Sequence, residues 1–167
     1  MIRLTLATDF ALRTLLYVAS QPGTWVSARA VAEFYGISAD HVSKVAQTLT
    51  HAGYLKAGRG RSGGLQLGRV PEDVSVGDIV ELFEGPVGLL ECVTRDNVCV
   101  IQPGCRLRQV LDQAGKRLIR ELKGVTLADL IRPASAELVQ LGTSDRPLSA
   151  SLEAVFATGR EDAPAEE

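Results

Sequence analysis

Apolar residues in the first part of the chain fall on one face of a helix, with polar residues between them. The first such stretch runs from Phe10 to Ala19 and is followed by Gln21-Pro22-Gly23, a sequence that ends helices. Its apolar positions are Phe10, Leu12, Leu15, Leu16, Val18 and Ala19. We therefore predict a first helix over residues 10–19.

Two shorter helices with clear boundary signals are predicted next. Ser27 is a good N-cap for a helix that ends at Gly36, because glycine readily adopts the left-handed conformation past a helix end. Ser38 caps a second helix over residues 39–52, and Gly53 ends it. The apolar face of this second helix consists of Val42, Val45, Ala46 and Leu49. Two capped helices joined by a short turn form a helix-turn-helix pattern.

A β-hairpin with a basic, glycine-rich tip is predicted after these helices. Residues 54–57 and 65–67 have the composition of short strands. The sequence between them is Gly58-Arg59-Gly60-Arg61-Ser62-Gly63-Gly64. A hairpin directly after the second helix of a helix-turn-helix is the wing of a winged helix. A further helix is predicted over residues 76–84, between Ser75 and Gly85-Pro86.

The rest of the chain divides into a loop, a long helix and a tail. Residues 88–104 contain Gly, Pro, Asp and Asn and are predicted to form an irregular loop. An apolar stripe follows at steps of three and four, made of Leu107, Leu111, Ala114, Leu118, Leu122 and Val125. A stripe of this length predicts an interface helix and a homodimer. A short helix over 127–131 ends before Pro133, and the Ser-, Pro-, Ala- and acid-rich residues 143–167 are predicted to be a disordered tail.

These elements predict a mainly α fold with a small β-hairpin wing. We expect a winged helix-turn-helix DNA-binding domain over residues 1–86 and a loop over 87–105. A dimerisation helix and a short end helix follow over 106–133.

The charge of the chain is divided between its two halves. The net charge is −2, but residues 1–70 carry eight Lys and Arg against three Asp and Glu, whereas residues 71–167 carry ten against seventeen. A basic front half suits a module that contacts phosphate groups, and an acidic rear half suits sensing or assembly. The sequence has neither a signal peptide pattern nor a membrane-spanning apolar run, so we expect a cytoplasmic protein with no membrane partner.

The expected partner is double-stranded DNA with a pseudo-palindromic operator. Four residues at the start of the helix over 39–52 are of the types that meet bases and phosphates in a major groove, namely Ser38, His41, Ser43 and Lys44. An ordinary solvated helix face is the alternative interpretation for each of them. Arg59 and Arg61 lie on the flexible tip of the hairpin, from which a cation can reach the DNA backbone or the minor groove.

The three cysteines, Cys92, Cys99 and Cys105, all lie on the predicted loop or at its end. Their spacing, with six and five residues between them, is not the Cys-x-x-Cys pattern of zinc sites or thioredoxin-like redox sites. Three thiolates on one loop can hold one face of an iron-sulfur cluster, with the fourth ligand supplied from elsewhere. Two alternatives are that the cysteines are small buried apolar residues or a cluster-free thiol switch.

The chain resembles the Rrf2 type of bacterial regulators over about residues 1–133. The resemblance is carried by Leu4-Thr5, by Thr8-Asp9-Phe10-Ala11-Leu12-Arg13, by the wing sequence 58–64, and by the three-cysteine segment that runs into Cys105-Arg106-Leu107. It is closest to the nitric-oxide-sensing members of that type, the NsrR proteins, because of Cys105-Arg106-Leu107-Arg108 and Thr126-Leu127-Ala128-Asp129-Leu130.

The resemblance implies an iron-sulfur cluster held by the three cysteines, of the [4Fe-4S] type, with [2Fe-2S] as the alternative. Members of the IscR kind use a histidine three residues after the last cysteine, and this chain has Arg108 there, which cannot ligate iron. The fourth ligand implied is Asp9 of the partner subunit; the alternative for Asp9 is a helix N-terminal acid that interacts with the helix dipole.

The function implied is a DNA-binding repressor, not an enzyme, that senses nitric oxide through its cluster. One alternative is a regulator that responds to iron or cluster status, as the RirA or IscR members do. Another alternative, from a different class, is an iron-sulfur electron carrier, for which a helix-turn-helix and a basic wing would have no purpose.

Overall fold

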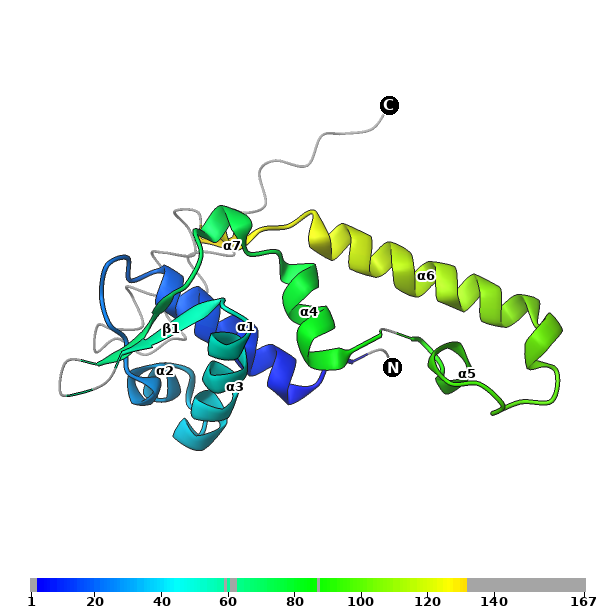
Figure 1. Ribbon diagram of the computed structural model, residues 1–167, viewed down its shortest axis with the longest axis horizontal. Coiled ribbons are helices and arrows are strands. Elements are labelled where there is room, and N and C mark those ends of the chain that lie inside the picture. Colours follow the sequence, from blue (N-terminus) through cyan, green and yellow to red (C-terminus); the bar gives the residue numbers. More distant parts are fainter. Residues whose placement is uncertain (1–2, 59, 61–62, 87, 132–167) are drawn as a thin grey trace, which may run out of the picture.

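The computed structural model describes residues 3–58, 60, 63–86 and 88–131 of the 167-residue chain. The described part is mostly helical and contains one two-stranded antiparallel hairpin (Figure 1). Its α-helices are α1 (Leu6–Ala19), α2 (Ala28–Tyr35), α3 (Ala39–His51), α4 (Val76–Glu84), α5 (Glu91–Thr94), α6 (Arg106–Lys123) and α7 (Leu127–Leu130). The strands are β1 (Leu55–Gly58) and β2 (Gly64–Leu67), and short 3-10 turns lie at η1 (Pro71–Asp73) and η2 (Gln102–Gly104). The predicted fold class is confirmed.

Helices α1, α2 and α3 form the core of the winged-helix domain. Their inward positions are fully or almost fully buried, and the largest of these side chains include Leu15, Val31, Val42 and Leu49. The predicted caps are present: the hydroxyl of Ser27 accepts from the amide of Ala30, and Ser38 accepts from the amide of Asp40. Gly36 ends α2 with φ 64°, the left-handed conformation that its sequence position predicts.

The hairpin pairs in register from Leu55 with Leu67 to Gly58 with Gly64. Val26, in the segment between α1 and α2, adds one rung on the other side of β2. Its amide donates to Leu65 O at 2.9 Å, and the amide of Leu65 donates to Val26 O at 2.7 Å. The wing is thereby attached to the segment that starts the helix-turn-helix.

Helix α6 extends from the winged-helix domain as an arm, and α5 lies beside its far end (Figure 1). The C-terminal end of α6 packs on α4. The amide of Val76 donates to Val125 O at 2.9 Å, and a Cβ on the buried Gly77 would come within 2.6 Å of the backbone nitrogen of Lys123. Glycine is therefore required at position 77 for the two helices to approach this closely.

One helix boundary and one loop differ from the sequence prediction by more than a single residue. Helix α1 begins at Leu6, four residues earlier than predicted, because Thr5 acts as its N-cap and accepts from the amide of Thr8. The predicted irregular loop over 88–104 contains a helical turn, α5, which is supported by an ion pair between Arg95 and Glu91 at 2.6 Å. The predicted tail over 143–167 lies outside the described residues. None of the helices described is long and apolar enough to span a membrane.

Candidate nucleic-acid interface and cysteine loop

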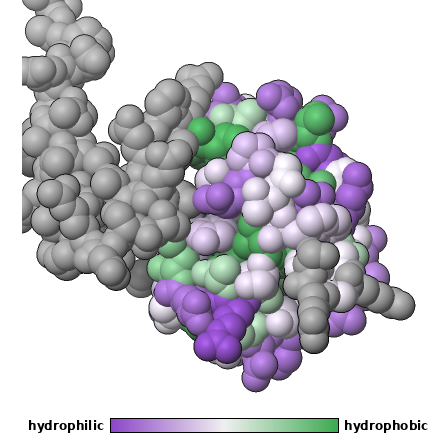
Figure 2. Space-filling model, turned by 90° about the vertical axis from the view of Figure 1, so that its left-hand side faces the viewer, coloured by the Kyte–Doolittle hydropathy of each residue, from purple (hydrophilic) through white to green (hydrophobic). Residues whose placement is uncertain are grey.

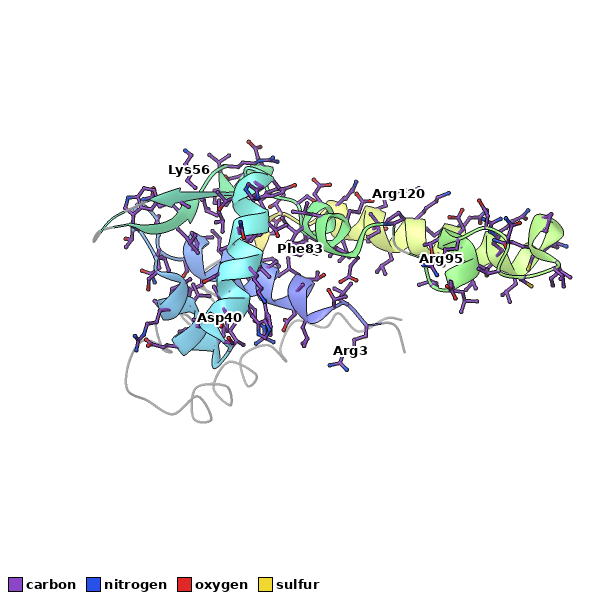
Figure 3. All side chains as sticks on the ribbon, turned by 60° about the horizontal axis from the view of Figure 1, so that its bottom comes forward. Arg3, Asp40, Lys56, Phe83, Arg95 and Arg120 are labelled. Carbon is purple, nitrogen blue, oxygen red and sulfur yellow. The ribbon has the colours of Figure 1, made fainter. Side chains whose placement is uncertain are left out.

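The four candidate DNA-contacting residues of α3 are all exposed. The structure shows two of their hydroxyls in local hydrogen bonds: Ser38 caps the helix, and Ser43 donates to Ala39 O at 2.8 Å. The side chains of His41 and Lys44 stand on the same exposed face. Figure 3 shows Asp40 at the N-terminal end of α3. There a carboxylate interacts favourably with the helix dipole, but it would repel a DNA phosphate group.

Sequence reasoning missed Gln47 on this face. Gln47 lies three residues after Lys44 and four after Ser43, and it is exposed. Positions at this spacing are neighbours on a helix surface, and a glutamine amide can pair with the edge of adenine. The helical spacing from Lys44 was a signal that could have found it.

The wing is held against the end of α3 by Arg69. Its Nη2 donates to Ala52 O at 2.9 Å, and its guanidinium carbon lies 4.1 Å from the centroid of the Tyr54 ring. A Cβ on Gly68 would come within 2.5 Å of Gly53 O, so the strand that leaves the wing passes directly over the end of α3. Helix α3, the helix proposed to be the recognition helix, and the base of the wing therefore form one unit.

The tip of the wing carries the two predicted arginines, Arg59 and Arg61, which lie outside the described residues. Lys56 on β1 is exposed and projects from the hairpin (Figure 3). Figure 2 looks onto the side of the molecule that lies at the left of Figure 1, where α2 and the hairpin are. Its coloured surface is a mixture of hydrophilic and intermediate residues with small separate apolar patches.

The three cysteines lie on one segment between α4 and α6. Cys92 is in α5 and half-buried, Cys99 is exposed in the loop, and Cys105 is half-buried at the N-cap of α6. Two neighbouring hollows open on this loop, one lined by Cys99 and the other by Cys105. Among the residues that the structure describes, no three His, Cys, Asp or Glu side chains are close enough together to hold a metal ion.

Asp9 lies in the first turn of α1 and pairs with Arg13. The Nε of Arg13 lies 2.8 Å from Oδ1 of Asp9, and both side chains are about two-fifths exposed. A carboxylate has two oxygens, so this ion pair leaves Oδ2 for another partner. Within one chain, Asp9 shares no metal-binding group with the cysteines in the described residues.

Glu84, at the end of α4, is bonded to the start of α1. Its Oε1 accepts from the amide of Thr5 at 2.7 Å, from the hydroxyl of Thr5 at 2.9 Å, and from the hydroxyl of the fully buried Thr8. Burial opposes ionisation of Glu84, but these hydrogen bonds outweigh it and hold the pKa of Glu84 below its ordinary value of 4.5. Residues 79 positions apart make this contact, and no local pattern in the sequence predicts it.

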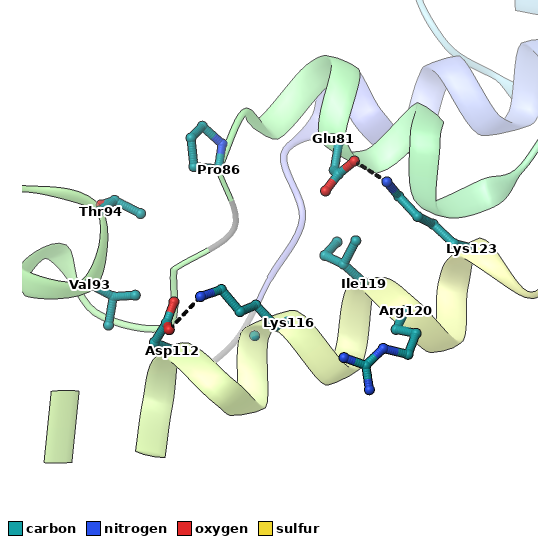
Figure 4. Close-up of a pocket in the computed structure, with 10 residues that line it drawn as sticks. Glu81, Pro86, Val93, Thr94, Asp112, Lys116, Ile119, Arg120 and Lys123 are labelled. Atoms are coloured by element: carbon teal, nitrogen blue, oxygen red, sulfur yellow. Dashed lines mark hydrogen bonds and ion pairs between the residues drawn. The ribbon is translucent and has the colours of Figure 1, made fainter. Parts of the chain in front are cut away.

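A cavity of about 600 Å³ separates α4 and α5 from the middle of α6 (Figure 4). The charged residues that line it are largely paired. Lys123 lies 2.7 Å from Glu81, and Lys116 lies 2.7 Å from Asp112. The hydrogen bond to Glu81, followed by one to Asp78, raises the pKa of Lys123 above its ordinary value of 10.5. The ion pairs of Lys123 join α6, which has the last cysteine at its N-cap, to α4, whereas Lys116 and Asp112 pair within α6.

The donor set of the loop fits an iron-sulfur cluster in its chemistry. Thiolates are the preferred ligands of such clusters, and this segment holds all three cysteines of the chain. Arg108, in the position where a histidine could have ligated, forms an ion pair with Asp96 at 3.0 Å across the loop. Arg108 therefore cannot supply a fourth ligand.

The family model described as Rrf2, iron-dependent transcriptional regulator, matches residues 4–133. Solved structures with a similar fold include CymR, the global cysteine regulator of B. subtilis, at 23% identity and a TM-score of 0.64, covering 78% of this chain and 97% of that one. IscR of T. potens is similar at 24% identity and a TM-score of 0.63, covering 89% of this chain and 96% of that one. CymR of Staphylococcus aureus is similar at 22% identity and a TM-score of 0.62, covering 77% and 97%.

Proposed function

From the premise that the chain belongs to the Rrf2 family of transcriptional regulators, we propose that it is an iron-sulfur repressor that releases its operator in response to nitric oxide. Membership of the family confirms that the chain is a transcriptional regulator and not an enzyme. Beyond the regulator role, we propose an iron-sulfur cluster as the cofactor, nitric oxide as the effector and a homodimer as the assembly.

The observation that supports the proposal most is a segment that contains three cysteines and has Arg108, in place of a histidine, three residues after the last of them. The guanidinium of Arg108 is bonded to Asp96 and cannot ligate iron. Cys92, Cys99 and Cys105 would hold three irons of a [4Fe-4S] cluster, with [2Fe-2S] as the alternative, and the fourth ligand would be Asp9 of the partner subunit. When bound, such a group supplies an iron with an oxygen ligand that nitric oxide can displace.

The exposed apolar residues of α6 support a homodimer. Leu107, Val110 and Leu118 are 60%, 61% and 38% exposed on a helix that projects from the winged-helix domain. Burial of such side chains against a second copy is favourable. A two-fold dimer of winged helices reads a pseudo-palindromic site when its two recognition helices match the spacing of the half-sites.

The residues around Asp9 supply the coupling to DNA. Asp9 lies on α1, which packs against α3, and the adjacent Thr8 is bonded to Glu84 at the end of α4. A ligand bond from Asp9 to the cluster of the partner subunit would fix α1 and, with it, the recognition helix. Loss of that bond would release the winged-helix domain from the partner subunit, and the two recognition helices would no longer be held at the spacing of the half-sites.

The competing candidate is a regulator that responds to iron or cluster status. The similarity in fold to IscR of T. potens favours it. A cluster-free thiol switch is the third candidate, and the similarity in fold to CymR of Staphylococcus aureus, a protein that was solved in an oxidized form, favours that one. All three candidates keep the DNA-binding role and differ in what the cysteines do.

Anaerobic titration with nitric oxide tests the proposal. The purified protein should be coloured, should contain about four irons per chain by mass spectrometry under non-denaturing conditions, and should lose operator affinity as nitric oxide bleaches the visible absorption. Serine at Cys92, Cys99 or Cys105 should abolish stable cluster binding. Val100→Ala is the matched control, because Val100 lies beside Cys99 and is 98% exposed.

Each other outcome selects a different candidate. Release of the operator on iron chelation, with no response to nitric oxide, identifies an iron-status regulator. A colourless protein whose operator affinity changes on thiol oxidation identifies a thiol switch. A coloured protein with no affinity for any DNA would contradict all three candidates.

A further inference from the structure

Gln102 is a buried polar residue on an exposed loop. Its side chain is 6% exposed, whereas the preceding residues Val100 and Ile101 are 98% and 65% exposed. A buried amide is costly unless it is hydrogen-bonded. The sequence therefore places a polar side chain inside the loop and apolar side chains outside it, the reverse of what solvation alone would favour.

The buried amide of Gln102 is bonded to three backbone groups. Its Nε2 donates to Cys92 O at 2.9 Å and to Arg95 O at 2.6 Å, and its Oε1 accepts from the amide of Val98 at 3.1 Å. The two carbonyls lie at the end of the short helix α5, where no helical partner remains for them. Both amide protons are used, so the side chain is well satisfied.

The backbone of Gln102 extends the same set of contacts. Its amide donates to Cys99 O at 3.1 Å, and its carbonyl accepts from the amide of Cys105 at 3.4 Å. Gln102 is thus hydrogen-bonded to the backbone of each of the three cysteines of the chain, once through its side chain and twice through its main chain. Asn97 lies between Arg95 and Val98, two residues whose backbones are bonded to the Gln102 side chain. It has φ 62°, a left-handed conformation that such hydrogen bonds help to hold.

We propose that Gln102 is the positioning residue of the cysteine loop, which holds the backbones of Cys92, Cys99 and Cys105 so that their thiolates can be drawn onto one cluster. This inference rests on the proposed iron-sulfur function. Gln102 itself does not ligate iron; it keeps the loop folded before and after the metal binds. Outer residues that orient ligands typically change metal affinity by about 10- to 100-fold when removed.

The chemistry of the side chain restricts which substitutions can replace it. Alanine leaves two carbonyls and one amide of the loop without partners. Glutamate has nearly the same shape, but a carboxylate donates no hydrogen bond and would face the two carbonyl oxygens of Cys92 and Arg95. Both substitutions should therefore open the loop, even though glutamate preserves its packing volume. Gln113→Ala is the matched control, since Gln113 is exposed on α6 and lies in none of these contacts.

The experiment compares the parent, Gln102→Ala, Gln102→Glu and Gln113→Ala as full chains. The first readout is hydrogen exchange of the amides of Val98 and Cys105 in the cluster-free protein, which needs no metal. The second is the rate at which an iron chelator removes the cluster from anaerobically loaded protein, followed by absorbance and iron content. We expect faster exchange in both Gln102 variants and cluster loss on the order of tenfold faster than in the parent, with Gln113→Ala unchanged.

The outcomes separate this inference from the proposed function. Should the parent take up no iron and sulfide, the iron-sulfur function is rejected, and the ligand-positioning role is rejected with it. If the parent loads a cluster and Gln102→Ala keeps it as long as the parent does, the inference alone is wrong. Thermal unfolding monitored by the fluorescence of Trp25 in the winged-helix domain verifies that each variant keeps its fold.

Discussion

The imidazole of His41 packs against the ring of Phe10, with centroids 5.6 Å apart and planes inclined by 31°. Phe10 follows the proposed ligand Asp9 on α1, and His41 stands on the exposed face of α3. Through Phe10, this contact joins the turn of α1 that contains Asp9 to the helix proposed to read DNA. The sequence predicted a DNA contact or a solvated position for His41, and the structure adds the ring of Phe10 as a neighbour.

Phe10→Leu should weaken the coupling between cluster and operator. Leucine keeps the apolar contact of α1 with the core but removes the ring pair, which is worth about 0.5–1.5 kcal/mol beyond burial. The ratio of operator affinities between cluster-loaded and cluster-free protein should fall by about two- to tenfold. Fluorescence anisotropy with a labelled operator measures both affinities.

Phe34→Leu is the control for this prediction. Phe34 also lies in an aromatic contact, at 5.0 Å from Tyr17, but on α2 and away from Asp9. It should leave the affinity ratio unchanged. An equal fall of the ratio in both variants would show that general loosening of the core, and not the Phe10 contact, carries the coupling.

The wing depends on a close approach between Trp25 and Gly58. A Cβ on Gly58 would lie 2.9 Å from Cζ3 of the indole, and Gly58 does not have the positive φ that alone would require glycine. Gly58→Ala should displace the ring and cost about 1–3 kcal/mol, as overpacking does. Operator affinity should fall with it, because Gly58 borders the basic tip that carries Arg59 and Arg61.

The same alanine should be tolerated once the indole is gone. In a Trp25→Ala background, Gly58→Ala should cost less than about 0.5 kcal/mol, as for a substitution that meets no clash, because no indole remains to be displaced. Urea unfolding of the four proteins of this cycle gives the coupling energy. An equal cost in both backgrounds would show that something other than the indole makes position 58 intolerant.

Much of this fold follows from local sequence signals. Helices α2, α3 and α4 have the predicted limits within one residue, because their caps, Ser27, Ser38 and Ser75, hydrogen-bond to the first turn as expected. The spacing of Val42, Val45 and Leu49 predicts the buried face of α3 for the same reason. Such signals act over three or four residues and are therefore visible in a single chain.

The contacts that organise the candidate site are not visible in this way. The bond from Thr5 to Glu84 spans 79 residues, and Gln102 becomes the centre of the cysteine loop only once α5 and the turn at Asn97 have formed. The composition of residues 88–104 correctly excludes a long helix, but it contains no periodicity that predicts which side chain turns inward. The identity of the cluster ligands remains a prediction from resemblance.

Acid should destabilise the protein partly through Glu84. Because its pKa in the folded protein is lowered, the stabilisation from its ionised form is complete above the ordinary value of 4.5 and is lost as the pH falls through the lower folded value. Glu84→Gln should therefore be less stable than the parent near neutral pH, and the difference should shrink as the pH decreases below about 4.5. Melting temperatures from pH 3 to pH 7 check this; a constant difference would mean that the charge of Glu84 is irrelevant.

Asp9 provides the most direct test of how the cluster would control DNA binding. Oxygen binds cluster iron less firmly than thiolate does, so a carboxylate ligand leaves one iron open to nitric oxide. Asp9→Ala should still acquire a cluster on Cys92, Cys99 and Cys105 but should lose the connection between subunits, and its operator affinity should no longer depend on the cluster. Asp9→Cys should hold the cluster more firmly and respond to nitric oxide more slowly.

Asp9 also forms an ion pair with Arg13, and the experiment must separate that pair from ligation. The pair is two-fifths exposed, so its loss should cost no more than about 1 kcal/mol of stability. Arg13→Gln removes the same ion pair and keeps the carboxylate, and it should therefore retain a nitric oxide response that Asp9→Ala lacks. Iron counts by mass spectrometry and operator binding before and after nitric oxide give both quantities for each variant. If Asp9→Ala binds and releases the operator as the parent does, Asp9 is a helix N-terminal acid paired with Arg13, and the cluster controls DNA binding by a route that does not pass through α1.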